Sequence, residues 1–267
     1  MKRRFLAIGM LVSFAGSLQA QMPDGLAKTD QPVDCGNEKV AIFEGTASKD
    51  GRYALGWTVR PNRKPGPVDW SSYRPDDPGD FYERHPFVGT GNDYDMDKQD
   101  YQLVDGVVDL RAKKFTPLQG NSPYYPGKNH WGLFVSWSKD RGGIRRAVVG
   151  NQARFSTYNL WLVSLKPDGP QIVELSPRAD KAVEAYLHKR DPKDYQRYGT
   201  SYELGDSARD SEPSGTVFAE DTVTIRFIAE IPKSERDHDA GRLTLSLATG
   251  EVLRIEPAKT SRPAGAH

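Results

Sequence analysis

The composition of the chain sets the first limits on its function. The chain has 267 residues, of which 37% are hydrophobic, and its formal net charge is +1 at pH 7. Basic and acidic residues are intermixed, so the chain lacks the basic excess that binding to nucleic-acid phosphates requires. The single cysteine, Cys35, cannot form an internal disulfide, so the hydrophobic core must hold the fold. We interpret Cys35 as a packed or solvent-facing residue, with a reactive thiol or an intermolecular disulfide as the alternative.

The first twenty residues have the pattern of a secretory signal peptide. Lys2, Arg3 and Arg4 precede an apolar stretch at 5–14, and small residues follow up to Ala20. The apolar stretch is too short to span a bilayer, which needs about 20 apolar residues. We therefore expect a periplasmic or secreted protein with no membrane span. Its net charge falls from +1 to −2 when the three basic residues are removed with the signal.

Short runs of β-branched and aromatic residues dominate the chain after residue 38. They are bounded by Gly, Pro, Asp or Asn, as strands are. In the run TVTIRFIAEI at 222–231, alternate residues from Val223 to Ile231 are apolar, which predicts a strand with one buried face. One helix is predicted at 176–189, capped by Ser176 and ending before Pro192. Its predicted apolar face consists of Ala179, Val183, Tyr186 and Leu187.

Three segments share one order of elements: strand, turn, strand, longer loop and closing hairpin. They span roughly 39–119, 131–176 and 216–257. The sequence therefore predicts an all-β fold of three four-stranded antiparallel meanders with one inserted surface helix. We expect a single β-repeat domain at 38–257. The predicted flexible flanks are 21–37 and 258–267.

The turns of these units carry a recognisable motif. The first unit has Ser48-Lys49-Asp50-Gly51-Arg52, the second has Ser138-Lys139-Asp140, and the third has a weaker Glu220-Asp221. This pattern resembles the Ser-Pro-Asp-Gly-Lys/Arg turn of TolB-like and WD-like β-propeller repeats, with Lys49 in place of Pro. The resemblance implies blades packed in a ring, but three blades do not close one. A blade without its signature, a ring completed by two chains, or an open or sandwich-like assembly remain the alternatives.

The sequence contains few patterns that indicate catalysis. It has no Gly-x-Ser-x-Gly elbow, no His-Glu-x-x-His and no phosphate-binding loop. We therefore predict no cofactor and no catalytic residues. The triplet of Asp93, Asp95 and Asp97 is similar to the first half of a Ca²⁺ loop, but Lys98 replaces the turn glycine. A solvated acidic loop is the favoured interpretation, with a metal site as the alternative.

Two loops rich in aromatic residues are the predicted place of binding. The loop at 60–100 is unusually long, and its aromatic residues argue against disorder. A repeat architecture could bring it beside the loop that precedes Trp131. The predicted ligand-binding residues are Trp70, Tyr73, Tyr82, Arg84, His85, Tyr124, Tyr125, His130 and Trp131. The alternative is that these rings bury one another and cap the sheets.

The leading hypothesis is a non-enzymatic binding protein for a protein, peptide or glycan partner. One alternative is a glycan-directed hydrolase with paired carboxylates, because such pairs leave no spacing in a sequence and aromatic loops suit sugars. The other alternative is a structural envelope protein.

We predict that the secreted protein lacks residues 1–20, because a signal peptidase removes them. The measurement is the intact mass of protein recovered from the periplasm or the medium. A mass that includes Met1 would contradict the prediction.

Overall fold

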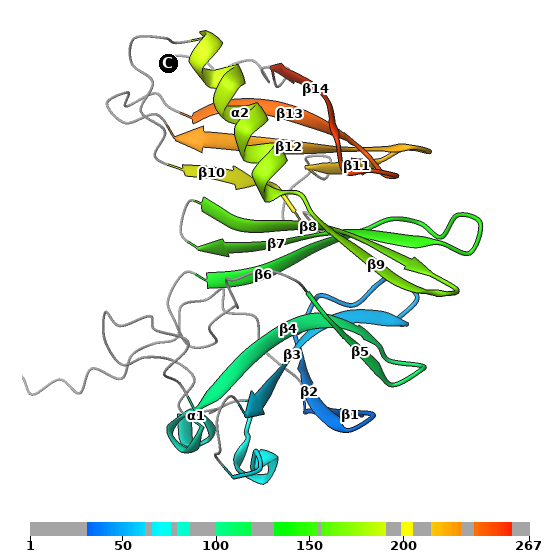
Figure 1. The fold of residues 1–267 in the computed structure, drawn as a ribbon, viewed down its shortest axis with the longest axis vertical. Coiled ribbons are helices and arrows are strands. Elements are labelled where there is room, and N and C mark those ends of the chain that lie inside the picture. Colours follow the sequence, from blue (N-terminus) through cyan, green and yellow to red (C-terminus); the bar gives the residue numbers. More distant parts are fainter. Residues whose placement is uncertain are drawn as a thin grey trace, which may run out of the picture.

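The fold consists of three antiparallel sheets. The computed structural model describes residues 31–61, 66–75, 79–85, 100–118, 131–153, 156–190, 199–204, 215–230 and 238–257. The sheets lie one above another along the long axis, in the order first, second and third (Figure 1). This confirms the predicted all-β class with antiparallel sheets, and the second sheet is a four-stranded meander as predicted.

The first sheet has five strands in the order of the chain. They are β1 (Val33–Cys35), β2 (Glu38–Ile42), β3 (Tyr53–Pro61), β4 (Tyr101–Asp109) and β5 (Lys114–Pro117). The fifth strand, beyond the four predicted, is β1, which pairs with β2 through a two-residue turn at Gly36, where φ is 67°. The domain boundary predicted at residue 38 falls within this hairpin. Between β3 and β4 lie a 3-10 helix (Trp70–Ser72) and the short helix α1 (Gly79–Arg84).

The second sheet is a four-stranded meander and the third has five strands. The second consists of β6 (Trp131–Trp137), β7 (Arg145–Ala153), β8 (Ser156–Lys166) and β9 (Gly169–Glu174). The third consists of β10 (Gly199–Tyr202), β11 (Thr216–Phe218), β12 (Thr222–Glu230), β13 (His238–Ser246) and β14 (Val252–Pro257). Both β10 and β11 pair with β12, at its two ends, so the count exceeds the predicted four.

Two cores hold the stack together, one on each face of the second sheet. Val149, Trp161 and Val163 pack toward the first sheet, against residues such as Leu55 and Trp57. The alternate residues of the same strands, Val148, Leu160 and Leu162, pack toward the third sheet. In β12 the predicted alternation is confirmed, because Val223, Ile225, Phe227 and Ala229 are all buried. The second sheet is therefore buried on both faces.

Helix α2 (Ser176–Arg190) matches the predicted position and completes the second core. It crosses the third sheet (Figure 1), and Ala179, Val183 and Leu187 are buried against that core. The hydroxyl of Ser176 accepts a hydrogen bond from the amide of Leu160 in β8, at 2.7 Å, and so ties the start of the helix to the second sheet. Among the described residues, no helix is long and apolar enough to cross a membrane.

The first sheet is strongly curled, and two glycines allow the curl. Gly56 and Gly106 face each other across β3 and β4. A Cβ at Gly106 would lie 2.5 Å from the carbonyl oxygen of Thr116, and a Cβ at Gly56 would lie 2.7 Å from that of Ala41. The curl encloses a small third cluster that includes Cys35. Burial raises the pKa of the Cys35 thiol, with help from the nearby carboxylates of Asp34 and Glu38, so the thiol is kept in its unreactive protonated form.

We predict that Gly106→Ala lowers the free energy of unfolding by about 1 to 3 kcal/mol, because the new methyl group overpacks against backbone. Gly66→Ala is the matched control, since a Cβ there meets no atom within 4 Å. Urea unfolding followed by circular dichroism measures both. Equal stability of the two variants would contradict the proposed cause of the curl.

Candidate functional site

The Ser-x-Asp turns of the first two units have the same hydrogen bonding. In the first, the amide of Tyr53 donates to Ser48 Oγ at 2.9 Å, and the amide of Ser48 donates to the carbonyl of Tyr53 at 2.6 Å. In the second, the amide of Arg146 donates to Ser138 Oγ, and the amide of Ser138 donates to the carbonyl of Arg146, both at 2.8 Å. Each serine therefore closes a turn at the start of the next strand.

The aspartates of the two turns accept hydrogen bonds from backbone amides. Asp50 Oδ1 accepts from the amide of Arg52 at 3.4 Å, and Gly51 has a φ of 66°. Asp140 Oδ1 accepts from the amide of Gly143 at 3.1 Å. The repeated motif thus corresponds to two turns of different length in which the serine and the aspartate bond to the backbone.

An ion pair between sheets joins the first turn to the second sheet. Arg145 at the start of β7 donates to Asp50 Oδ2 at 2.8 Å, and only 9% of this arginine is exposed. A hydrogen bond from Ser48 Oγ lowers the pKa of Asp50, and the amide of Arg52 and the charge of Arg145 lower it further. Beside this pair, Trp137 Nε1 donates to the carbonyl of Thr46 at 2.8 Å.

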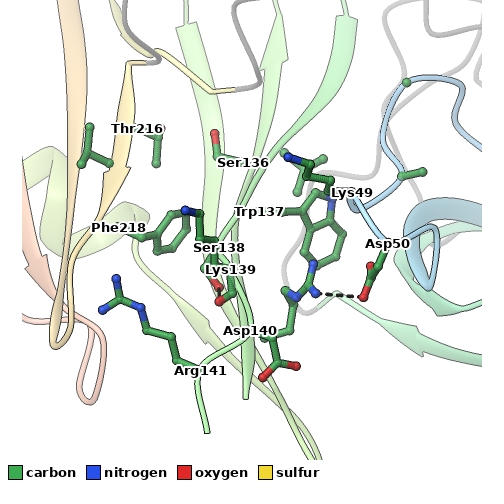
Figure 2. Close-up of a pocket in the computed structure, with 15 residues that line it drawn as sticks. Lys49, Asp50, Ser136, Trp137, Ser138, Lys139, Asp140, Arg141, Thr216 and Phe218 are labelled. Carbon is green, nitrogen blue, oxygen red and sulfur yellow. Dashed lines mark hydrogen bonds and ion pairs between the residues drawn. The ribbon is translucent and has the colours of Figure 1, made fainter. Parts of the chain in front are cut away.

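A pocket of about 920 Å³ opens where the two turns meet the third sheet. Figure 2 shows Lys49 and Asp50 on one side, Ser136 and Trp137 at the back, and Phe218 on the other side. The pocket is lined by Gly45, Ala47, Lys49, Asp50, Val135, Ser136, Trp137, Ser138, Lys139, Asp140, Arg141, Arg145, Thr216, Val217 and Phe218. All three sheets therefore contribute to one concave site.

The charge of this pocket is predominantly positive. Four basic side chains line it against two carboxylates, and one carboxylate, Asp50, is already paired with Arg145. Lys49, Lys139 and Arg141 are exposed and have no ion-pair partner among the described residues. The pocket can therefore attract and hold an anion.

The basic residues of the pocket were not among the predicted site residues. One signal could have found two of them, because Lys49 and Lys139 occupy the same position of the repeated turn. Arg145 could not have been found this way, because its partner Asp50 lies 95 residues away in the chain.

The predicted aromatic site lies at the opposite ends of the strands from this pocket. The 3-10 helix follows β3, and both α1 and the start of β6 lie on that side of the molecule (Figure 1). Trp70 and Tyr73 pack with Trp57 and Phe81, at ring distances of 4.8 to 6.1 Å. Tyr73 is 1% exposed, so its ring belongs to the core.

The imidazole of His85, the residue after α1, forms a hydrogen bond with the residue that precedes the 3-10 helix. Its Nε2 accepts a hydrogen bond from the amide of Asp69 at 2.9 Å, so Nδ1 is the nitrogen free to donate, and the carbonyl of Phe81 lies 2.9 Å from it. The imidazole is 3% exposed. Arg84 is exposed beside it, with a guanidinium nitrogen 3.7 Å from Asp69.

The side chains of the other predicted ligand-binding residues lie outside the described part of the structure. The backbones of Tyr82 and Trp131 belong to α1 and β6, but their side chains lie outside the described part of the structure. Tyr124, Tyr125 and His130 lie outside the described residues, as do Asp93, Asp95 and Asp97. Ligand binding by the nine residues therefore stays a prediction, and so does the metal site. Within the described ranges, no group of three or more His, Cys, Asp or Glu side chains could hold a metal ion.

Comparisons with protein-family models, with curated proteins and with solved structures found no match to this chain. Its function must therefore be argued from the pocket itself.

We predict that Asp50→Asn destabilises the protein by about 1 kcal/mol, a modest value because Asp50 is 45% exposed and solvent screens the pair. The folded-state pKa of Asp50 lies below 3.8, so its contribution is present above that pH and is lost as the pH falls through the folded pKa. The difference in melting temperature between the variant and the unchanged protein should therefore be constant near neutral pH and shrink below pH 3.8.

The control is Asp168→Asn, in an exposed turn without an ion-pair partner among the described residues. It should change the melting temperature little at any pH. A difference for Asp50→Asn that grows on acidification would show that the ion pair does not stabilise the fold.

Proposed function

We propose that the protein is a periplasmic or secreted, non-enzymatic binding protein that holds an anionic ligand in the pocket between the three sheets. The observation that carries the proposal is the convergence of Lys49, Lys139 and Arg141 on one concave surface without carboxylate partners among the described residues. Exposed cations at one pocket repel one another, so an anion between them relieves repulsion as well as adding attraction.

The shape and lining of the pocket also suit a ligand. Its volume of about 920 Å³ falls within the range of known ligand sites. Trp137 and Phe218 supply aromatic surface near the cations. Trp137 is fixed by its bond to Thr46 and by stacking on Tyr53, with ring centroids 6.1 Å apart. The indole of Trp137 is therefore held in place before a ligand arrives.

The lowered pKa of Asp50 makes this residue unsuitable as the proton donor of a glycan hydrolase. Such enzymes need one carboxyl group that stays protonated until it acts, which requires a raised pKa. The pKa of Asp50 is lowered instead, because the carboxylate accepts a hydrogen bond from Ser48 and faces Arg145. Asp50 is therefore suited to hold the arginine and the turn.

The test measures binding of three anionic probes: inorganic phosphate, trigalacturonate and hexaglutamate. We predict that at least one binds the mature protein and that added salt weakens the binding, because the attraction is between exposed charges. Lys49→Ala, Lys139→Ala and Arg141→Ala should each weaken it by about threefold to tenfold. Isothermal titration calorimetry gives the affinities.

Lys181→Ala is the matched control, since Lys181 is an exposed cation on α2 and does not line the pocket. It should leave the affinity unchanged. If no probe binds, or if the triple variant of the pocket cations binds as well as the unchanged protein, the proposal is wrong and the structural envelope protein becomes the better interpretation.

A further inference from the structure

The pocket is bordered by a strand edge that pairs with no other strand in the described part of the chain. β6 is the last strand of the second sheet on this side, with β7 as its neighbour. The amide of Ser138 donates to the carbonyl of Arg146, which marks this pair as hydrogen-bonded. Because bonded and non-bonded pairs alternate along an antiparallel ladder, the N–H and C=O groups of Val135 and Trp137 point away from β7.

A second unpaired edge faces the same pocket from the third sheet. The carbonyl of Gly215 accepts from the amide of Arg226, and the amide of Ala219 donates to the carbonyl of Thr222. The same alternation turns the backbone groups of Phe218 in β11 away from β12. Val135, Trp137 and Phe218 all line the pocket, and among the described residues no strand pairs with β6 or β11 on this side.

We propose that the anionic ligand is an extended peptide segment with acidic side chains, which adds to the free edge of β6 as a further strand. The proposal rests on the proposed function and specifies its ligand. Unpaired edges attract extended chains because every added residue pair forms main-chain hydrogen bonds. The outward groups of Val135 and Trp137 are about 6.8 Å apart, the two-residue repeat of a strand.

The charged groups give the peptide its sequence preference. Lys139 and Arg141 follow the end of β6, and Lys49 lies across the pocket from Phe218 (Figure 2). A strand beside β6 would carry alternate side chains toward these cations, so Asp or Glu at alternate positions matches the site. A glycan or a phosphate ion could satisfy the cations, but neither provides the row of amide and carbonyl groups that the strand edge requires.

The test selects binders from a random heptapeptide library with acetylated N-termini and amidated C-termini, so that terminal charges cannot contribute. The selected peptides should be rich in Asp and Glu. The best one is then resynthesised with N-methyl groups on alternate amides, in both registers. One register should lose at least about tenfold in affinity and the other should bind normally, because only one edge of the peptide pairs with β6.

Hydrogen exchange gives a readout on the protein itself. The amides of Val135 and Trp137 should exchange faster in the free protein than in the complex, whereas the amide of Ser138, already bonded to Arg146, should change little. Equal effects of N-methylation in both registers, or unchanged exchange at Val135 and Trp137, would overturn strand addition.

The outcomes separate this inference from the proposed function. Binding of phosphate or trigalacturonate through the three cations, with no peptide selected, would overturn the inference and leave the proposed function standing. If no probe and no peptide binds in a way that depends on the pocket cations, both the proposed function and the inference are wrong. Selected peptides without acidic residues would also overturn the inference, because the cations would then have no role in recognition.

Discussion

The structure depends on a second sheet that buries both of its faces. Strands β7 and β8 present Val149, Trp161 and Val163 to one core and Val148, Leu160 and Leu162 to the other. A sheet in this position has no solvent-facing side, so its neighbours must supply matching apolar faces. With no disulfide available to the chain, this double burial is the main source of stability, and it fixes the order in which the three sheets stack.

The same stacking explains why the site forms where it does. The first two sheets present their Ser-x-Asp turns at the same ends of their strands, and the Asp50 to Arg145 pair joins the two ends. Lys49 and Lys139, which follow the serines, are thereby brought to one pocket. The repeat therefore has two consequences: its serines and aspartates hold the turns, and its lysines are left exposed at the same pocket.

Local patterns in the sequence predicted the strands and the helix α2, but they did not single out the basic residues of the pocket. Alternation in β12 and the apolar face of α2 were readable because they are properties of consecutive residues. The extra strand β1 was missed because it has three residues, too few for a periodic signal. The pocket depends on side chains from three sheets, and single lysines in turns look like ordinary solvated residues. The predicted aromatic residue Tyr73 is explained by packing against Trp57, which no spacing in the sequence reveals.

The free edges at the pocket follow from how the meanders begin. β6 is the first strand of its meander and pairs only with β7, and the three-residue strand β11 pairs only with β12, so within the described ranges each has one side without a neighbouring strand. Proteins usually block such edges with charged side chains, because an open edge invites pairing with any extended chain. Lys139 and Arg141 follow the end of β6, and both are cations. Such charges repel basic chains and attract acidic ones. The same cations that protect the edge against pairing with any chain therefore make it selective for acidic partners.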